Sequence, residues 1–320
     1  MTRILLVKTS SMGDVIHNLP VATDIRRHLP SATIDWVVEE QYAPLVAMHP
    51  AVNRVIPIAL RRWRRAPFSG TSWREFAAFR RALRSHAYDA IVETQGLLKS
   101  AVVARLARGP VSGFGPATAH ERLACLLYDN TSEFPPEAHK ILRYRSVAAR
   151  ALGYAVAGAI DYGIAPRVPR PAIAAGRYCL AFHATARAAK LWPEASLAEL
   201  VRLLQRAGCA CILPWGSDEE RARSERIAAA ADGAIVPPKF SLEEISALVA
   251  GAAVVVGVDT GFTHLAAALA RPVVGIFCDS NPVDASPIGP GPTAYRGHIG
   301  KPPAVGAVAD AIREVVPGSV

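Results

Sequence analysis

The first fifteen residues place a strand, a polar turn and a helix in that order. Residues 4–7 (Ile-Leu-Leu-Val) are an apolar run of strand length, residues 8–14 (Lys-Thr-Ser-Ser-Met-Gly-Asp) are a polar turn, and helical periodicity starts at Val15. This order is typical of the first βα unit of a parallel α/β sheet. Ligands of such sheets bind at the carboxyl ends of the strands, so chemistry is expected in this turn.

Asp14 stands at the far edge of the turn, and two interpretations of it are open. The carboxylate could simply cap the following helix by accepting hydrogen bonds from its orphan N–H groups. It could instead be a functional group at the end of the strand. The second half of the chain repeats the architecture with polar turns of its own, which favours the functional interpretation.

The first half of the chain alternates strands and helices. We expect strands at residues 4–7, 33–38, 54–58, 88–93 and 111–114, and helices at 15–28, 73–85, 97–107 and 140–152. Pro166, Pro169 and Pro171 then mark a segment where helix and central strand are both disfavoured. The pattern predicts a doubly wound domain over residues 1–165 and an interdomain linker at 166–177.

The second half starts the same pattern again. We expect strands at residues 178–182, 210–214, 253–258 and 273–277, helices at 194–207, 219–231, 242–250, 263–269 and 305–316, and a loop with little regular structure at 279–303. A second doubly wound domain is therefore predicted over residues 178–304. Two such halves imply a ligand cleft between facing strand ends.

The composition fits two domains of ordinary size. The 320 residues are 51% hydrophobic and 20% charged, which is enough to bury two cores and argues against disorder. Neither a secretory signal nor an apolar stretch of bilayer length is visible, so we expect a cytoplasmic protein. The five cysteines include no Cys-x-x-Cys pair, which favours buried free thiols over a metal or redox site.

Positive charge is concentrated in the first half. Residues 1–165 carry 21 Lys and Arg against 13 Asp and Glu, a net +8, whereas residues 166–320 carry 15 against 14, a net +1. The densest cluster is Arg61-Arg62-Trp63-Arg64-Arg65. A basic cluster around an aromatic fits nucleic acid, anionic lipid or a polyanionic small substrate, and a merely solvated face is the plainer alternative.

Three polar turns of the second half follow a strand and precede a helix, at residues 183–190, 215–220 and 259–264. A helix N-terminus offers unpaired N–H groups and partial positive charge, and a Gly or Thr there lets a phosphate approach. Thr260, Gly261 and Thr263 fit a phosphate-binding turn, and Lys190 would add the full positive charge that a diphosphate needs. His264 taken alone is more typical of a structural histidine.

The common nucleotide fingerprints are missing. No Gly-x-Gly-x-x-Gly follows a strand, and Gly300-Lys301 is followed by Pro302 where a P-loop requires Ser or Thr. No His-x-x-x-His or carboxylate cluster suggests a metal. A nicotinamide dehydrogenase and a P-loop NTPase are therefore both disfavoured.

Five ordered motifs carry a resemblance to a known family. They are residues 8–14, residues 36–40 (Trp-Val-Val-Glu-Glu), residues 61–64 (Arg-Arg-Trp-Arg), residues 213–216 (Leu-Pro-Trp-Gly) and Asp259-Thr260-Gly261-x-x-His264. Together they closely resemble the lipopolysaccharide heptosyltransferases of glycosyltransferase family nine. The resemblance implies the GT-B fold, with two Rossmann-like domains, an N-terminal one for the acceptor and a C-terminal one for the donor. It also implies that the last helix, within residues 305–320, packs back on the first domain.

The resemblance further implies a reaction and its residues. A heptose would move from ADP-L-glycero-β-D-manno-heptose to Kdo of Kdo2-lipid A, with inversion and without a metal or cofactor, by a protein bound peripherally to the cytoplasmic face of the inner membrane. The family's general base falls on Asp14. The donor residues would be Thr185, Lys190, Thr260, Gly261 and His264 for the diphosphate, Asp259 for the heptose, and Trp215, Gly216, Glu219, Glu220, Lys239, Phe240 and Leu242 for the adenosine. The acceptor residues would be Ser10, Ser11, Arg61, Arg62, Arg64, Arg65, Arg122 and His139.

One turn departs from the family pattern, which tends to read His-Ala-Thr-Thr-Arg-Asp-Asp-Lys. Here the second Thr is Ala186 and the two acids are Ala188 and Ala189, while Lys190 is kept. A GT-B transferase that uses another nucleotide sugar is therefore an alternative. A nucleic-acid-binding protein is a second alternative, disfavoured because no aromatic-rich strand accompanies the basic cluster and because it would leave the Asp14 turn unexplained.

Overall fold

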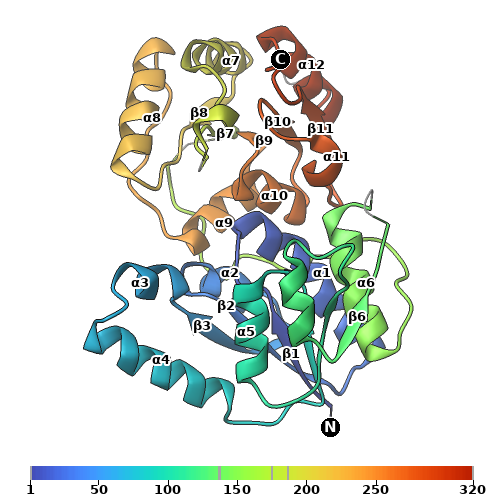
Figure 1. Ribbon diagram of the computed structural model, residues 1–320. Helices are drawn as coiled ribbons and strands as arrows, with labels where there is room; N and C mark the ends of the chain where they lie inside the picture. The colour runs from blue at the N-terminus through green and yellow to red at the C-terminus, as the bar shows by residue number, and fades with distance from the viewer. Residues whose placement is uncertain (1, 136–137, 174–175, 186, 319–320) are drawn as a thin grey trace. The chain divides into compact units, whose positions relative to one another are not determined.

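A computed structural model describes residues 2–135, 138–173, 176–185 and 187–318 (Figure 1). The chain divides into two compact units, Met1–Ile164 and Ala165–Val320. The division falls beside the proline-rich segment. Each unit is built on one sheet of parallel strands.

The first unit contains a six-stranded sheet in the order β3-β2-β1-β4-β5-β6. Its strands are β1 (Arg3–Val7), β2 (Thr33–Glu39), β3 (Val52–Ile58), β4 (Ala90–Glu93), β5 (Val111–Phe114) and β6 (Asn130–Ser132). After β1 the chain adds β2 and β3 on one side of β1. It then adds β4, β5 and β6 on the other side. The direction of winding therefore changes between β1 and β4, which is the switch point where doubly wound sheets bind ligands.

Helices cover this sheet as right-handed crossovers require. They are α1 (Met12–His28), α2 (Ala43–Ala47), α3 (Leu60–Arg65), α4 (Gly70–Leu83), α5 (Leu98–Leu106) and α6 (Lys140–Leu152), with short 3₁₀ turns η1 (Glu40–Tyr42) and η2 (Arg122–Leu127). Side chains of α4, α5 and η2 share one core cluster with Leu5 and Val7 of β1. α1 and α6 pack on each other and supply no residue to that cluster. α1 connects β1 to β2 in the opposite direction along the sheet and so covers its other face.

The second unit contains a five-stranded sheet in the order β11-β10-β9-β7-β8. Its strands are β7 (Tyr178–Phe182), β8 (Ala210–Ile212), β9 (Val254–Val258), β10 (Val273–Ile276) and β11 (Thr293–Arg296). Its helices are η3 (Ala188–Lys190), α7 (Glu194–Arg206), α8 (Asp218–Ala230), α9 (Leu242–Gly251), α10 (Gly261–Ala268), α11 (Pro282–Ala285) and α12 (Val305–Val315). Winding changes direction between β7 and β9, so this pair marks the second switch point.

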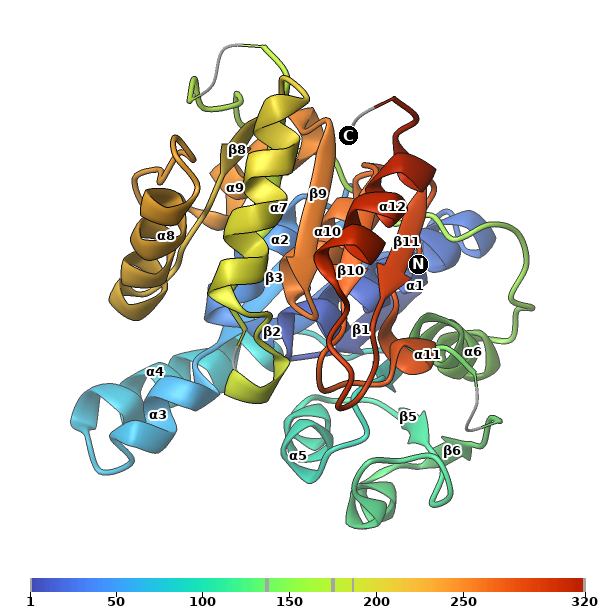
Figure 2. The same cartoon turned by 90° about the horizontal axis from the view of Figure 1, so that it is seen from above.

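One expectation for the end of the chain differs from the structure, and a second is not tested by it. Residues 279–303 contain α11 and the edge strand β11, which pairs with β10 in parallel. β11 is half-exposed and flanked by Gly and Pro. It lacks the apolar run that identifies a buried strand, so the sequence does not predict it. The predicted packing of the last helix on the first domain stays a prediction. α12 packs beside α7 and on β10 and β11 of its own unit (Figure 2), because its apolar face completes that core.

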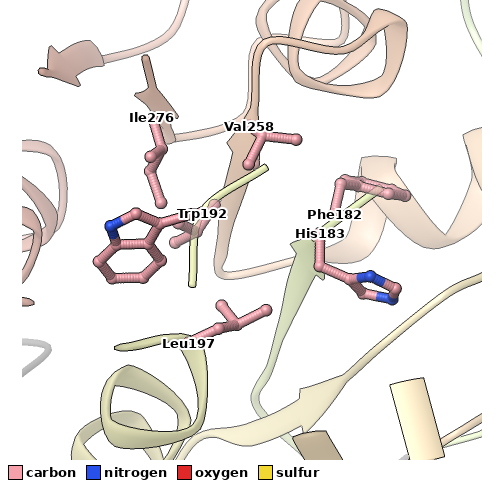
Figure 3. A pocket seen from close by; sticks show the side chains of 8 residues that line it. Phe182, His183, Trp192, Leu197, Val258 and Ile276 are labelled. Carbon is pink, nitrogen blue, oxygen red and sulfur yellow. The ribbon is translucent and has the colours of Figure 1, made fainter. Parts of the chain in front are cut away.

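The core of the second unit leaves one small cavity of about 10 Å³ near the end of β7 (Figure 3). Apolar side chains dominate its wall, including Trp192, Leu197 and Ile276. His183 also borders it, but its Nε2 is 2.7 Å from Ser224 Oγ and is thereby fixed to α8. This volume holds at most a single water molecule, so the cavity belongs to core packing rather than to a substrate site.

Candidate active site

A cavity of about 290 Å³ lies at the switch point of the first sheet. It is lined by Lys8, Ser10, Ser11, Asp14, Gln95, Leu97, His120 and Tyr144. The turn after β1 supplies Lys8, Ser10 and Ser11, and the first turn of α1 supplies Asp14. The segment after β4 supplies Gln95 and Leu97. Parallel pairing of β1 with β4 therefore brings together residues that are about eighty positions apart. Ser10, Ser11 and Asp14 lie where the sequence predicts a site.

Asp14 accepts hydrogen bonds at both carboxylate oxygens. Oδ2 accepts from the Ser11 backbone N at 3.2 Å and from Ser11 Oγ at 2.8 Å. Oδ1 accepts from Tyr144 Oη at 3.0 Å and from Lys140 Nζ at 3.4 Å. The Ser11 contacts belong to a helix cap, whereas the α6 contacts serve no cap. The structure therefore shows Asp14 as a cap residue whose second oxygen has contacts that no cap requires, and its functional interpretation stays a prediction.

Positive charge around Asp14 keeps it ionised. Burial alone would raise the pKa of this carboxyl group, but Lys8 and Lys140 outweigh burial and hold the pKa of Asp14 far below its ordinary value. Burial lowers the pKa of Lys8 to about 8, against the opposing pull of Asp14. Lys8 is only 1% exposed, and its Nζ donates to the Thr94 carbonyl oxygen at 2.8 Å. Asp14 is thus a carboxylate throughout the neutral range.

Sequence reasoning missed several residues of this cavity. Gln95 Oε1 accepts from Thr9 N and Thr9 Oγ1, each at 2.8 Å, and so ties the turn after β4 to the turn after β1. Lys8 Nζ lies 3.6 Å from the ring centroid of Tyr144. Lys140 and Tyr144 are four positions apart on α6, so the sequence alone places them on one helix face. It does not show that this face lies against Asp14.

The basic cluster lies on α3, and its arginines differ in their surroundings. Arg62 pairs with Glu75 at 2.7 Å and with Glu40 at 2.9 Å, so carboxylates balance its charge. The side chains of Arg61, Arg64 and Arg65 are exposed. The cluster is therefore a partly neutralised surface in which Arg64 and Arg65 are the most available to an anion.

The two remaining predicted acceptor residues lie on different elements. Arg122 is exposed at the start of η2. His139 caps α6, with Nδ1 accepting from Ile141 N at 3.3 Å, and its ring meets that of His17 edge-on at 5.4 Å. His139 immediately precedes Lys140, so it fixes the end of the helix that contacts Asp14.

The second sheet has its own polar cluster where β7 and β9 end side by side. Lys190, after β7, forms an ion pair with Asp259, which directly follows β9. Thr185 Oγ1 donates to the Asp259 carbonyl oxygen at 3.2 Å, and His264 Nε2 lies 3.8 Å from Asp259 Oδ1. Burial would raise the pKa of Asp259, but hydrogen bonds from His264 and Lys190 hold it far below its ordinary value.

The helix that follows Asp259 presents its N-terminus at this cluster. Thr260 is the N-cap of α10, and Gly261 is its first residue. Thr263 differs from the prediction: its hydroxyl is buried and donates to the Val258 carbonyl oxygen at 2.8 Å, so it stabilises the turn instead of facing a ligand. A side chain at Gly257 would collide with that hydroxyl, at 2.4 Å, so the turn requires glycine there.

The residues predicted to bind adenosine surround the turn after β8. Trp215 Nε1 donates to the Pro237 carbonyl oxygen at 2.8 Å, and Arg221 and Lys239 lie over its ring at 5.4 and 6.0 Å from the centroid. The backbone N of Gly216 donates to Glu220 Oε2 at 2.7 Å. Glu219 is in the first turn of α8, and Phe240 and Leu242 are half-buried where α9 begins.

Two further predictions concern the turn after β7 and metal binding. Ala186 lies outside the described residues, while Ala188 and Ala189 are exposed in η3. Within the described ranges, no group of three or more His, Cys, Asp or Glu side chains is placed to hold a metal ion. Transfer without a metal stays a prediction.

Two doubly wound parallel sheets, each with a charged site at its switch point, have the architecture of a GT-B glycosyltransferase. A family model described as "Glycosyltransferase family 9 (heptosyltransferase)" matches residues 76–310, and the chain belongs to this family. The predicted fold class and enzyme class are confirmed.

Individual relatives agree with this assignment. Lipopolysaccharide heptosyltransferase 1 of Salmonella typhimurium LT2 is 44% identical over 283 residues, which cover 88% of this chain and 89% of the relative. The solved structure "E. coli heptosyltransferase WaaC with ADP" has a TM-score of 0.91 at 40% identity, covering 98% of this chain and all of the other. A second solved structure, with ADP-2-deoxy-2-fluoro heptose, has a TM-score of 0.87 at 42% identity, covering 98% and 99%. The Ser-Ser-Met-Gly-Asp form of the first turn predicts the heptosyltransferase I branch of the family, and these relatives confirm it.

Proposed function

We propose that the protein transfers L-glycero-D-manno-heptose from ADP-heptose to Kdo of Kdo2-lipid A in lipopolysaccharide inner-core biosynthesis. The observation that carries this proposal is the cavity around Asp14, where two lysines hold a carboxylate ionised beside open space. Relatives 44% identical are lipopolysaccharide heptosyltransferases, and one similar solved structure contains a fluorinated ADP-heptose. Both support the donor and the reaction class.

Asp14 acts as the general base in the proposed mechanism. An acceptor hydroxyl oxygen forms a bond to the anomeric carbon of the heptose from the face opposite ADP, so the configuration inverts. The bond from that carbon to the diphosphate oxygen breaks, and ADP keeps the electron pair. The acidity of the attacking hydroxyl rises steeply as its oxygen bonds to carbon. A carboxylate of low pKa, such as Asp14, can therefore take the proton.

The second unit stabilises the departing ADP. Lys190 and the N-terminus of α10, which starts with Thr260 and Gly261, offer positive charge to the diphosphate, and Thr185 and His264 complete this group. Asp259 binds the heptose hydroxyls, and Trp215 with its neighbours binds the adenosine. Lysine and helix dipole together take the role that a metal ion has in other transferases.

The first unit binds the acceptor, and the protein works at the cytoplasmic surface of the inner membrane. Exposed Arg64 and Arg65, with Arg61, Arg62, Arg122 and His139, meet the Kdo carboxylates and the lipid A phosphates. No helix within the described residues is long and apolar enough to cross a bilayer. Membrane association is accordingly proposed as peripheral.

Purified protein, ADP-heptose and Kdo2-lipid A test the proposal directly. ADP release is followed by a coupled assay, and mass spectrometry of the lipid detects one added heptose. We expect transfer with ADP-heptose, no transfer with UDP- or GDP-sugars, and undiminished transfer in EDTA. Transfer only from another nucleotide sugar would establish the alternative donor, and loss of activity in EDTA would contradict the metal-free mechanism.

A further inference from the structure

Large apolar side chains are exposed on one particular part of the first unit. The structure exposes seven of them among the described residues up to 164, and six of the seven are Phe68, Trp73, Leu98, Val102, Leu123 and Leu126. These six lie on α4, α5, η2 and the loop between α3 and α4, whereas the seventh, Leu142, lies on α6. Large apolar side chains exposed on neighbouring elements of one layer are candidates for an interaction site.

These elements form one layer of the fold. α4, α5 and η2 share the core cluster that packs on a single face of the first sheet, and α5 contacts η2 directly. Their inward residues fill the core, so the exposed ones point to the outside of the same layer. Leu98 and Val102 are four positions apart on α5, and Leu123 and Leu126 are three apart on η2, so each pair extends along one side of its element. We call this set of six the apolar outer face.

The most exposed members surround the turn between α3 and α4, which Figure 1 shows at the outer end of the unit. Phe68 is 95% exposed and Trp73 is 62% exposed. The Trp73 ring meets Phe76 edge-on at 6.5 Å, and Phe76 meets Trp63 edge-on at 5.8 Å. Aromatic packing thus holds Trp73 at the surface, while Phe68 projects from the loop.

The positive charge of this layer indicates an anionic partner. The segment from Leu60 to Leu83 contains seven arginines and a single acid, Glu75. Lys99 on α5 and Arg122 on η2 add to the positive side, whereas Arg105 on α5 is paired with Asp129 at 2.8 Å. Aromatic and aliphatic side chains surrounded by arginines match a bilayer interface, where rings enter the headgroup level and cations meet anionic lipids. The carboxylates Glu75 and Asp129 of this layer are already paired, with Arg62 and Arg105, so they do not repel anionic lipid.

We propose that the apolar outer face docks on an anionic phospholipid bilayer, with Phe68 and Trp73 entering the interface and the surrounding arginines binding headgroup phosphates. This inference rests on the proposed function in one respect: the lipid acceptor would lie in the same bilayer on which this face docks. Docking by α4, α5 and η2 orients the first unit with this face toward the membrane. It needs no spanning helix.

Vesicle binding tests the surface in the full-length protein. Co-sedimentation is measured with vesicles of phosphatidylcholine alone and of phosphatidylcholine mixed with phosphatidylglycerol. We expect binding to the anionic vesicles only, weakened by salt because a Debye length of about 3 Å at 1 M screens the arginines. Trp73 is the most exposed of the five tryptophans, so its emission should shift to the blue and be quenched by brominated lipid.

Variants locate the contact. Phe68→Ser with Trp73→Ser should weaken binding at least about tenfold, since each loses the burial of a large apolar side chain. Leu98→Ser with Val102→Ser should weaken it less, and Arg74→Gln by about fivefold. The matched control is Leu142→Ser, which removes a 43% exposed apolar side chain from α6. If wild type ignores anionic vesicles, or if the control weakens binding as much as the Phe68 and Trp73 pair, the proposal is wrong.

Transfer to a deacylated, water-soluble acceptor separates this proposal from the function. The Phe68 and Trp73 variants should keep wild-type kcat with that acceptor and lose transfer to acceptor embedded in anionic vesicles. Absence of transfer by wild type to any acceptor would overturn the proposed function while leaving vesicle binding intact. Loss of transfer to the soluble acceptor in these variants would instead assign the two aromatics to acceptor binding and contradict bilayer docking.

Discussion

The two switch points have the same architecture and arrange their charges differently. In the first unit, Asp14 is a carboxylate beside two lysines, Lys8 and Lys140, and it lines a cavity of about 290 Å³. In the second unit, Lys190 is a cation paired with Asp259, next to the N-terminus of α10. At the first switch point a carboxylate is surrounded by more positive than negative charge. At the second, a lysine and a helix N-terminus offer positive charge to a ligand.

This difference indicates how one fold supports two tasks. Excess cation around a carboxylate guarantees its ionised form and leaves it free to accept a proton. A lysine whose partner is a carboxylate can exchange that partner for a phosphate, because both are oxyanions. The following variants test this division from the largest expected effect to the smallest.

Asp14→Asn should lower kcat by about 10²–10⁴-fold and leave ADP binding unchanged. The amide retains an oxygen that accepts from the Ser11 N–H, but it cannot take a proton. Turnover is measured by coupled ADP release, and ADP affinity by calorimetry. Ser11→Ala is the matched control, which removes one hydroxyl donor and keeps the carboxylate. If Asp14→Asn stays within a few-fold of the wild-type kcat, Asp14 is only a cap.

Lys190→Ala should weaken ADP binding and slow transfer by about 10²–10³-fold without unfolding the protein, because a cation at the leaving diphosphate is lost. It also leaves Asp259 without its ion-pair partner, which adds repulsion toward the diphosphate. Asp259→Asn combined with Lys190→Ala should recover part of the ADP affinity. Calorimetric titrations that are equal for wild type and Lys190→Ala would remove Lys190 from the donor site.

Lys8→Met should flatten the dependence of stability on alkaline pH. The folded-state pKa of Lys8, about 8, lies below its ordinary 10.5, so the unfolded chain binds more protons between these values and the free energy of unfolding rises with pH there. This shift amounts to at most about 3 kcal/mol. Urea unfolding of wild type and variant at several pH values isolates the contribution. An identical slope in both proteins would contradict the burial of a charged Lys8.

Lys8→Met also tests the assignment of Asp14 as the general base. Without the lysine charge the pKa of Asp14 rises, so the acid limb of kcat/KM should move to higher pH. Lys190→Met is the control at the other switch point and should leave that limb in place.

Arg64→Ala with Arg65→Ala should raise the acceptor KM by less than about tenfold, reduce its salt dependence and leave the donor KM unchanged. Arg62→Ala should have a smaller effect, since Glu40 and Glu75 already balance that arginine. Both KM values and their salt dependence are measured by steady-state kinetics, with each substrate varied in turn at low and at high salt. A change confined to the donor KM would reverse the assignment of acceptor and donor to the two units.

Local patterns predicted most elements because their signals are short in range. The run 4–7 and the helix after the turn appear as β1 and α1, although α1 begins at Met12, inside the predicted turn 8–14. The helix predicted at 140–152 has those bounds. β11 was missed because a half-exposed edge strand has no apolar run. Phe68 and Trp73 follow the basic cluster 61–65 in the sequence, but only burial in the fold shows that their side chains are exposed.

The sequence by itself determined the doubly wound class, the positions of the polar turns and the candidates Asp14 and Lys190, because periodicity and turn residues act within a few positions. The family resemblance added Asp259. Only the tertiary structure decided which residues surround them. Lys140 and Tyr144 lie 126 and 130 positions from Asp14, and Gln95 lies 86 from Thr9. Such contacts depend on strand order and on the face that each helix covers. Those are settled by packing of the whole core, which no local pattern contains.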